Sequence, residues 1–287
     1  MSLLSPPLEA FLAVAQHKTV HGAASSLHMT QTAITQRIRT LETKLKTTLF
    51  VRTRRGMVLT QEGEALIRYC HAAKSLEGET LATIQGAATQ SDIEISIAGP
   101  TSIMKSRIIP GCLSVLKKFT QLNIRFDIDD IENRHQKLKM GHVDFAVIQP
   151  EHLAREMAVK QLKSEQYILV CTSAWKKRKL RDIIASEHII DFDPSDRLTH
   201  HYLKMYDLYD IAYHARHFVN RTESLAMMVI EGLGYTTLAK EFAKPYIADG
   251  SLIALNHSKT YHHSYLLAWY ARPEPPRYFS AIINAID

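Results

Sequence analysis

Residues 20–45 read VHGAASSLHMTQTAITQRIRTLETKL, and this stretch decides the fold of the N-terminal part of the chain. Its small residues Ala23 and Ala24 favour a short helix that a second helix can approach closely. His28, Met29 and Thr30 follow as a turn, and Thr30 is a suitable N-cap for the next helix. Apolar side chains then recur at spacings of four, three and four residues and predict one buried stripe, at Ile34, Ile38, Leu41 and Leu45.

The opposite face of this second helix is polar and, near its start, uncharged. Its side chains are Gln31, Thr32, Thr35, Gln36 and Arg39. Glutamine pairs with adenine through two hydrogen bonds, and threonine offers a hydroxyl or a methyl group to a base edge. A recognition helix presents such side chains at the end that enters the major groove. We therefore expect these five residues to contact double-stranded DNA.

The segment LFVRTRRGMVLTQEG, residues 49–63, predicts two short strands around an arginine-rich turn. Such a hairpin beside a helix-turn-helix is a wing that contacts the DNA backbone. We expect Arg52 and Arg55 to hold phosphates and Arg54 to enter a minor groove.

Positive charge is concentrated in the same part of the chain. Residues 1–60 hold eight Lys and Arg side chains against two Glu, which equals the net charge of +6 of the whole chain. This distribution is typical of a module that binds a phosphate backbone. Charge alone does not exclude a basic face that meets only solvent.

No proline occurs between residues 62 and 88, and apolar side chains recur about every three and a half residues. The predicted seam is Leu66, Tyr69, Ala73, Leu76, Thr80 and Ile84 or Ala87. A helix this long and this narrowly apolar is expected to pair with another helix. A core helix of the following domain is the alternative interpretation.

From residue 91 onward, strand and helix patterns alternate. IEISIAG (93–99) alternates apolar and polar residues, and VDFAVIQ (143–149) is the continuously apolar strand of a sheet buried on both faces. TESLAMMVIEGLGY (222–235) predicts a strong helix with Thr222 as its N-cap. The alternation predicts an α/β sheet protein of two lobes between which the chain crosses twice.

The N-terminal motifs AASSL, TQTAITQRIRTLE, LFVRT-R and LTQEG resemble the LysR-type family of transcriptional regulators, in register over about sixty residues. The sequence departs from the family's usual pattern at Thr32 (proline is usual), Lys46 (glycine) and Glu62 (alanine). Thr32 lies on the expected reading face, so this departure bears on base preference.

The resemblance implies a mixed α/β protein: a winged helix-turn-helix, a long linker helix and a two-lobed effector domain built like a periplasmic binding protein. The implied boundaries are 1–60, 61–90 and 91–287, with one lobe formed by 91–162 and 266–287 and the other by 163–265. It also implies self-association as a homodimer or homotetramer, and an effector bound between the lobes.

Four later stretches resemble the ArgP/LysG branch of this family, whose members respond to lysine and arginine. They are IDDIENRHQKLKMG (128–141), IIDFDPSDRLTHHYLKMY (189–206), FVNRTESLAMMVIEGLGY (218–235) and LLAWYARPEP (266–275). The sequence departs from this branch at Arg197, where a second acid is frequent, and at Arg221, where a small residue is usual. Another amino acid or an anion therefore stays open as the effector.

A basic amino acid needs two opposite kinds of partner from its site. Its α-carboxylate suits hydroxyls and the N–H groups at a strand-to-helix turn or helix start, which Thr101, Ser102 and Thr222 supply. Its side-chain cation suits carboxylates, and the candidates are Asp130, Asp193 and Asp196. Gln149 at a predicted strand end completes the set. Asp193 has a competing explanation as a turn residue, and Asp130 as a surface residue.

Other classes of function find little support. No Cys/His set has metal-ligand spacing, and the common nucleotide-binding and hydrolase motifs are absent, so we expect no enzyme activity, no metal and no cofactor. The chain has no apolar run of membrane-spanning length and no secretory signal, and its three scattered cysteines suit the cytoplasm.

The sequence is therefore compatible with three functions. The first is an effector-controlled regulator. The second is an architectural DNA-binding protein without effector response, and the third is a solute-binding or enzymatic α/β protein.

Overall fold

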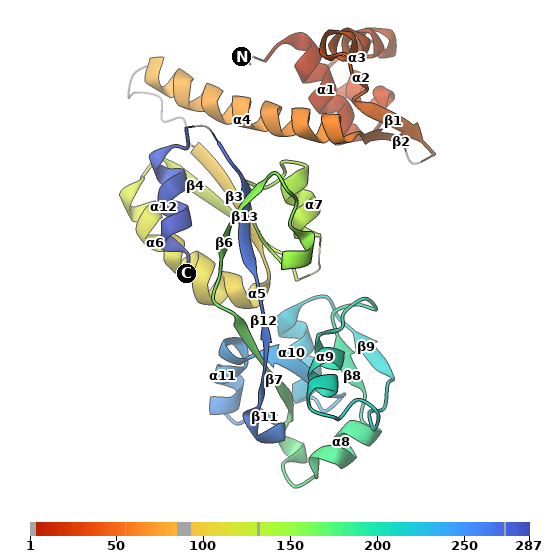
Figure 1. Cartoon of the computed structure of the whole chain (residues 1–287), viewed down its shortest axis with the longest axis vertical. Coiled ribbons are helices and arrows are strands. Elements are labelled where there is room, and N and C mark those ends of the chain that lie inside the picture. The colour runs from red at the N-terminus through yellow and green to blue at the C-terminus, as the bar shows by residue number, and fades with distance from the viewer. Residues whose placement is uncertain (1–3, 55, 85–92, 131–132, 273) are drawn as a thin grey trace. The chain divides into compact units, whose positions relative to one another are not determined.

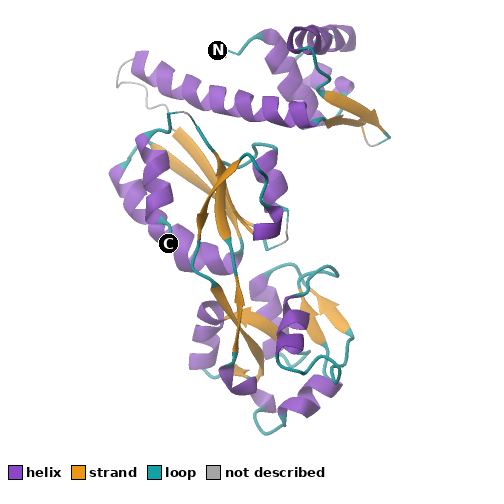
Figure 2. Ribbon diagram, in the orientation of Figure 1, coloured by secondary structure: helices purple, strands orange, loops and turns teal. Residues whose placement is uncertain are grey.

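The computed structural model describes residues 4–54, 56–84, 93–130, 133–272 and 274–287 (Figure 1). The chain divides into two compact units. The first comprises Met1–Ile95, Gln121–Ile124 and Gln136–Val143, and the second Ser96–Thr120, Arg125–His135 and Asp144–Asp287. Helices and strands alternate along most of the chain, as Figure 2 shows, which confirms the predicted mixed α/β fold class.

The N-terminal elements form the predicted helix-turn-helix with its wing. They are α1 Pro6–His17, α2 Val20–Ser26, α3 Gln31–Leu45, β1 Phe50–Thr53, β2 Gly56–Leu59 and the long helix α4 Gln61–Ile84. Phe11, Ala23 and Ile34 are fully buried at the centre of these elements. The Thr30 hydroxyl accepts a hydrogen bond from the N–H of Ala33 at 3.2 Å, which confirms it as the N-cap of α3.

The buried stripe of α3 is shorter than the sequence predicts. Ile34, Ile38 and Leu41 are buried, but Leu45 is 45% exposed, so the prediction is wrong for this residue. Lys46, directly after it, adopts the left-handed conformation that ends a helix and redirects the chain.

The wing is attached to α1 through backbone contacts. The N–H of Met57 donates to the carbonyl oxygen of Lys18 at 2.8 Å. Gly56 has a φ of 109°, and a Cβ at this position would lie 2.4 Å from the same oxygen. Glycine is therefore required here both by the backbone conformation and by the close approach of α1.

Helix α4 covers most of the predicted linker. Ile67 and Cys70 are buried against the helix-turn-helix core, whereas Tyr69 and Leu76 of the predicted seam are 58% and 62% exposed. The seam's last members, namely the side chains of Thr80 and Ile84 and all of Ala87, lie outside the described part of the chain, as do residues 85–90 of the predicted linker.

From Ile93 onward the chain builds two lobes whose sheets share no strand (Figure 1). The elements of lobe I are β3 Ile93–Gly99, α5 Thr101–Ile103, the π-helical turn η1 Met104–Ile108, α6 Ile109–Lys118, β4 Leu122–Ile128, α7 Arg134–Lys139, β5 Phe145–Ile148, η2 Pro150–His152, β6 Met157–Gln161, β13 Leu266–Tyr270 and α12 Arg277–Ala285. Its strand order is β4-β3-β5-β13-β6. All four residues of β5 are buried, as the apolar sequence predicts.

Lobe II is built around β7, which pairs with three other strands, all antiparallel. Its elements are β7 Glu165–Thr172, η3 Ser173–Trp175, α8 Leu180–Ser186, β8 Ile189–Asp191, α9 Leu198–Met205, β9 Arg216–Phe218, α10 Thr222–Ile230, β10 Thr236–Ala239, α11 Lys240–Ala248, β11 Leu252–Ala254, η4 Asn256–Ser258 and β12 Thr260–His263. A second, parallel sheet pairs β8 with β9.

The chain passes between the lobes twice, from β6 to β7 and from β12 to β13. The lobes also meet where Arg107 of η1 donates hydrogen bonds to the Lys163 carbonyl and, at 2.8 Å, to the Glu165 carboxylate. In the described part of the chain, no helix combines the length and the hydropathy that crossing a bilayer requires.

Candidate functional site

The first candidate site is the polar face of α3. Gln31, Thr32, Gln36 and Arg39 are exposed, and Thr35 is half-buried. The Thr35 hydroxyl donates to the Gln31 carbonyl at 2.9 Å, so this hydroxyl can only accept a hydrogen bond from a partner. The Gln31 amide nitrogen lies 3.2 Å from Nδ1 of His21 on α2. The predicted reading residues thus form one accessible surface of polar, mostly uncharged groups.

The wing adds positive charge. Arg52 on β1 and Arg54 in the turn are exposed, whereas Arg55 lies outside the described residues. The Thr53 hydroxyl donates to the Gly56 carbonyl at 3.0 Å and closes the turn. Two extended guanidinium groups on a short hairpin suit phosphate oxygens, which bind Arg through paired hydrogen bonds.

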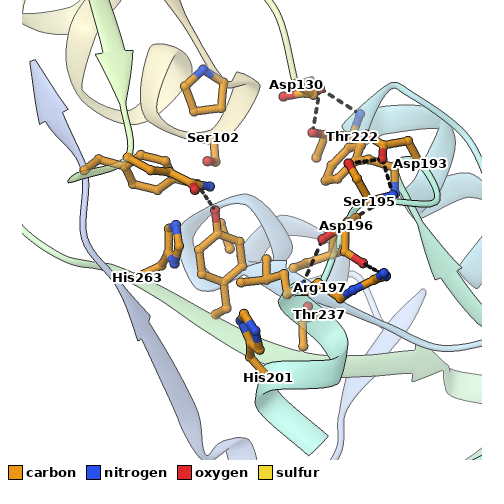
Figure 3. Close-up of a pocket in the computed structure, with 18 of the residues that line it drawn as sticks. Ser102, Asp130, Asp193, Ser195, Asp196, Arg197, His201, Thr222, Thr237 and His263 are labelled. Atoms are coloured by element: carbon orange, nitrogen blue, oxygen red, sulfur yellow. Dashed lines mark hydrogen bonds between the residues drawn. The ribbon is translucent and has the colours of Figure 1, made fainter. Parts of the chain in front are cut away.

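The second candidate site is a cavity of about 250 Å³ between the lobes of the second unit (Figure 3). Six of the seven residues predicted to bind an effector line it: Ser102, Asp130, Gln149, Asp193, Asp196 and Thr222. The seventh, Thr101, is 4% exposed and does not line the cavity. These residues come from β-strand ends, helix starts and one loop that are far apart in the sequence.

Asp130 lies at the centre of a hydrogen-bond network that joins the lobes. Its Oδ1 accepts the N–H of Thr101 at 2.7 Å, and its Oδ2 accepts the Thr101 hydroxyl at 2.9 Å. Oδ2 also accepts the Thr222 N–H at 3.1 Å and the Thr222 hydroxyl at 2.9 Å, from the start of α10 in lobe II. The two threonines therefore already bind a carboxylate, which belongs to the protein itself.

This network corrects the predicted cap of α10. Thr222 is the first residue of the helix and not its N-cap. Arg221 occupies the N-cap position, and its side chain makes no capping hydrogen bond. Asp130 takes over the capping, because it accepts the N–H of Thr222 from a segment that is 92 residues away in the sequence.

The loop after β8 presents two further carboxylates to the cavity. Oδ1 of Asp193 accepts the N–H of Ser195 at 2.6 Å and the Ser195 hydroxyl at 2.5 Å. Burial raises the pKa of Asp193, but these hydrogen bonds outweigh it and hold the pKa below its ordinary value. Asp196 accepts the N–H groups of Phe192 and Leu198 at 3.2 and 2.9 Å. Asp193 is therefore a stable anion at neutral pH.

The structure adds lining residues that sequence reasoning missed. The acidic and basic ones among them are Arg134, Glu151, Arg197, His201 and His263. Arg134 is 4% exposed and donates to the carbonyl oxygens of Val147 and Asp129 at 2.8 and 2.6 Å. A buried arginine at the start of a short helix has no sequence signal that separates it from an exposed one.

His263 contributes a neutral ring to the cavity. Burial lowers the pKa of its imidazole, and Nε2 is buried without a hydrogen-bond partner among the described residues. Together with Tyr167 and Tyr265, whose hydroxyl oxygens lie 3.2 Å apart, it forms the wall near the two crossing strands.

Neither metal binding nor thiol chemistry is supported by the described residues. No three His, Cys, Asp or Glu side chains in these ranges are placed to hold a metal ion. Cys70, Cys112 and Cys171 are free and buried. Burial raises the pKa of both Cys70 and Cys112 to about 11 and that of Cys171 to about 12, so each is a protonated, unreactive thiol at neutral pH.

Comparison with known families matches both parts of the chain. Residues 7–64 match the family described as "Bacterial regulatory helix-turn-helix protein, lysR family", and residues 88–287 match "LysR substrate binding domain". The HTH-type transcriptional regulator ArgP of Yersinia pestis (strain Pestoides F) is 27% identical over 255 residues, which are 86% of this chain and 82% of that protein. ArgP of Aeromonas salmonicida is 24% identical over 256 residues, 88% of this chain and 84% of that protein.

Two solved structures share the fold over nearly the whole chain. ArgP from Mycobacterium tuberculosis superposes with a TM-score of 0.78 at 22% identity, covering 99% of this chain and 96% of that one. Full-length LysG from Corynebacterium glutamicum with bound effector Arg gives a TM-score of 0.73 at 20% identity, with the same coverage of 99% and 96%. At this identity the likeness establishes the fold alone.

Proposed function

Because the chain belongs to the LysR family of bacterial regulatory helix-turn-helix proteins, we propose that it regulates transcription by reading operator DNA with α3 and the wing, under control of an effector in the interlobe cavity. The reading residues would be Gln31, Thr32, Thr35, Gln36 and Arg39. Arg52 and Arg55 would hold phosphates, and Arg54 would enter a minor groove. The chain would act in the cytoplasm, where the DNA is, as a homodimer or homotetramer paired through the exposed apolar side chains of α4.

We propose a basic amino acid, arginine or lysine, as the effector. The observation that carries this proposal is the charge of the cavity wall. Its described lining residues include four carboxylates, Asp130, Glu151, Asp193 and Asp196, against two guanidinium groups, Arg134 and Arg197. This surplus of negative charge suits a ligand with a net positive charge. LysG, with bound effector Arg, is a structural relative that supports the same class.

The arrangement suggests which end of the ligand each group would bind. The cationic side chain would meet the loop carboxylates Asp193 and Asp196, because the first is held ionised and both lie on the same wall. Arg134 carries the buried positive charge that an α-carboxylate requires, and the Ser102 hydroxyl also lines the cavity. Asp130 would receive the α-ammonium at Oδ1, which accepts one hydrogen bond from the described residues, against three at Oδ2.

Calorimetric titration of the full chain tests this assignment. We expect L-arginine or L-lysine to bind, and their neutral counterparts L-citrulline and L-norleucine to bind at least about tenfold more weakly, as for the loss of one charge-assisted hydrogen bond. Asp193→Asn should remove most of that preference. Asp249→Asn is the matched control, because Asp249 accepts the N–H of Ser251 at 2.9 Å in the same Asp-x-Ser geometry, outside the cavity.

A negative result would redirect the assignment. If none of the twenty amino acids bound or raised the melting temperature, the basic-amino-acid effector would be wrong. DNA binding without any such response would then favour a DNA-binding protein that acts without an effector.

A further inference from the structure

The loop 193–197 carries two of the cavity's carboxylates, and its own hydrogen bonds are local. Asp193 accepts hydrogen bonds from the residue two positions later, and Asp196 accepts the N–H groups of Phe192 and Leu198. These bonds set the internal shape of the loop. They do not fix where the loop sits on lobe II, which requires a contact from another segment.

Arg216, the first residue of β9, makes that contact. Its NH2 donates to the Pro194 carbonyl at 2.8 Å, and its NH1 donates to the Asp196 carbonyl at 3.1 Å. NH1 also donates to Oδ2 of Asp191 at 2.9 Å. One guanidinium group thus spans the loop from its second residue to its fourth and ties it to a carboxylate at the end of β8.

The pair is built into the lobe and does not touch the cavity. The side chain of Asp191 is 1% exposed and that of Arg216 14% exposed, and neither lines the cavity. Their strands β8 and β9 pair in parallel, with Asp191 opposite Phe218 and Ile189 opposite Arg216. The loop is therefore anchored to a backbone-paired element. Loss of Asp191 would leave the largely buried guanidinium of Arg216 without its carboxylate, and loss of Arg216 would leave the buried Asp191 carboxyl without its cation.

We infer that Arg216, held by Asp191, is the positioning residue that sets where the loop 193–197 presents its carboxylates to the effector. A binding group has to be held within about 0.5 Å of its productive position to discriminate between ligands. The fork of Arg216 can do this because its nitrogens are rigid and planar, and lysine has one nitrogen in place of three. The identity of the ligand rests on the proposed function, whereas the anchoring of the loop does not.

The test compares Arg216→Met and Arg216→Lys with Arg178→Met in the full chain. Arg178 also lies in lobe II and also bridges a carboxylate, that of Glu187 at 2.7 Å, but outside the cavity. It therefore controls for the general loss of an arginine ion pair. Arg216→Lys keeps a charge beside Asp191, so it stays informative if the methionine variant does not fold.

The first readout needs no ligand. Hydrogen exchange of the peptide that contains residues 192–198 reports how firmly the loop is held. We expect the exchange rate of this peptide to rise about tenfold in Arg216→Met and by less in Arg216→Lys. A tenfold change lies within the range of interaction free energies between residues in contact. Unchanged exchange in both variants, relative to Arg178→Met, would overturn the inference.

The second readout is ligand preference. The ratio of the Kd of L-citrulline to that of L-arginine should fall about tenfold in Arg216→Met, since the same interaction free energy between Arg216 and the loop is lost. The ratio should stay at the wild-type value in Arg178→Met. A uniform loss of both affinities would contradict a positioning role.

The two failures can be told apart. If the wild type bound neither arginine nor lysine while the loop of Arg216→Met exchanged faster, the effector class would be wrong and the anchoring right. If the wild type bound arginine and neither readout changed, the anchoring would be wrong and the effector class right.

Discussion

Asp191 and His200 of lobe II are ionisable side chains whose pKa values burial moves in opposite directions. Burial and the nearby Asp196 raise the pKa of Asp191 to about 6, despite the hydrogen bond from Arg216. Burial and the positive charges of Arg216 and Arg197 lower the pKa of His200 to about 4. Each group is thus harder to charge in the folded chain than in the unfolded one.

These shifts predict opposite effects on the free energy of unfolding between pH 4 and 6.5. Folded Asp191 takes up its proton near pH 6 and unfolded Asp191 near 3.8, so its contribution is present at low pH and is lost as pH rises across that window. His200 binds a proton near 6.5 when unfolded and near 4 when folded, so its contribution is present above 6.5 and is lost on acidification.

Urea unfolding at several pH values tests this pair. On acidification, the titration of Asp191 adds roughly 3 kcal/mol to the free energy of unfolding of the wild type. Asp191→Asn lacks this contribution, so acidification should destabilise this variant more than the wild type. His200→Gln should show the reverse. Parallel pH profiles for the wild type and Asp191→Asn would show that Asp191 titrates normally.

Thr101, Asp130 and Thr222 illustrate how much of the site the sequence predicts. Their residue types and their positions at strand ends and helix starts follow from pattern, and the sequence therefore places all three near an effector. Their bonding to one another does not follow from pattern, because Asp130 lies 29 residues from Thr101 and 92 from Thr222. Arg134 lines the cavity as a buried arginine, and nothing in the neighbouring sequence indicates that burial.

At the scale of elements, α3 and the wing should contribute different parts of DNA recognition. Gln31→Ala should cost about 1–3 kcal/mol of discrimination at one base pair, because a base edge loses its partner. Arg52→Ala should weaken binding to all sequences alike and lower the slope of log K against log salt by about 1, because one phosphate contact is lost. Binding of a selected operator and of its single-base variants across salt concentrations separates the two.

The control for this experiment is Lys74→Gln, a loss of one positive charge on α4. If Gln31→Ala lost affinity equally for every base variant, α3 would not be the reading element. If Arg52→Ala left the salt slope unchanged, the wing would not hold a phosphate.

Helix α4 should mediate self-association through its exposed apolar side chains. Leu76→Glu places a charge in the predicted seam, where Leu76 is 62% exposed, and burying an unpaired charge between helices is unfavourable. We expect sedimentation equilibrium to show a lower mass than for the wild type at equal concentration. Lys74→Gln makes the same change of charge on another face of the helix and should leave the mass unchanged. An unchanged mass in Leu76→Glu would exclude this seam.

Sequence periodicity predicts where helices lie but not every detail of their backbone geometry. Apolar spacing in the sequence does not show whether a turn is α-helical or π-helical, and η1 is π-helical. Pro110, in the first turn of α6, has no N–H with which to continue the α-helical ladder back to residue 106, and a wider turn precedes it. The effect depends on how the backbone adjusts around one ring, which apolar spacing does not encode.

At the scale of the whole second unit, the two lobes are joined by two crossing strands and by hydrogen bonds between their side chains and backbone. Asp130, after β4 of lobe I, accepts two hydrogen bonds from Thr222 of lobe II. Arg221 of lobe II donates to the carbonyl oxygen of Ile128 in lobe I at 3.2 Å. If an effector acts by closing the lobes, these contacts must be weak enough to break in the open state. An effector can shift the equilibrium between open and closed lobes only by the difference in its affinity for the two states.

Thr222→Val should therefore open the lobes of the ligand-free chain. It keeps the volume of the side chain but removes a hydrogen bond to a charged carboxylate, worth about 1.5–3 kcal/mol. The ratio of closed to open molecules should fall at least about tenfold. Spin labels on cysteines introduced at the exposed positions 117 and 177 would report this as longer or broader distances, since the three native cysteines are buried.

The matched control is Thr120→Val, the same change at an exposed position of lobe I. Asp130→Asn should open the lobes further than Thr222→Val, because it weakens every hydrogen bond that the carboxylate accepts. Saturating L-arginine should restore the short distances in Thr222→Val, because ligand groups then bridge the lobes in place of the lost hydroxyl. Distance distributions that match the wild type in both variants would mean that the crossing strands alone hold the lobes together, and that Asp130 serves only to cap α10.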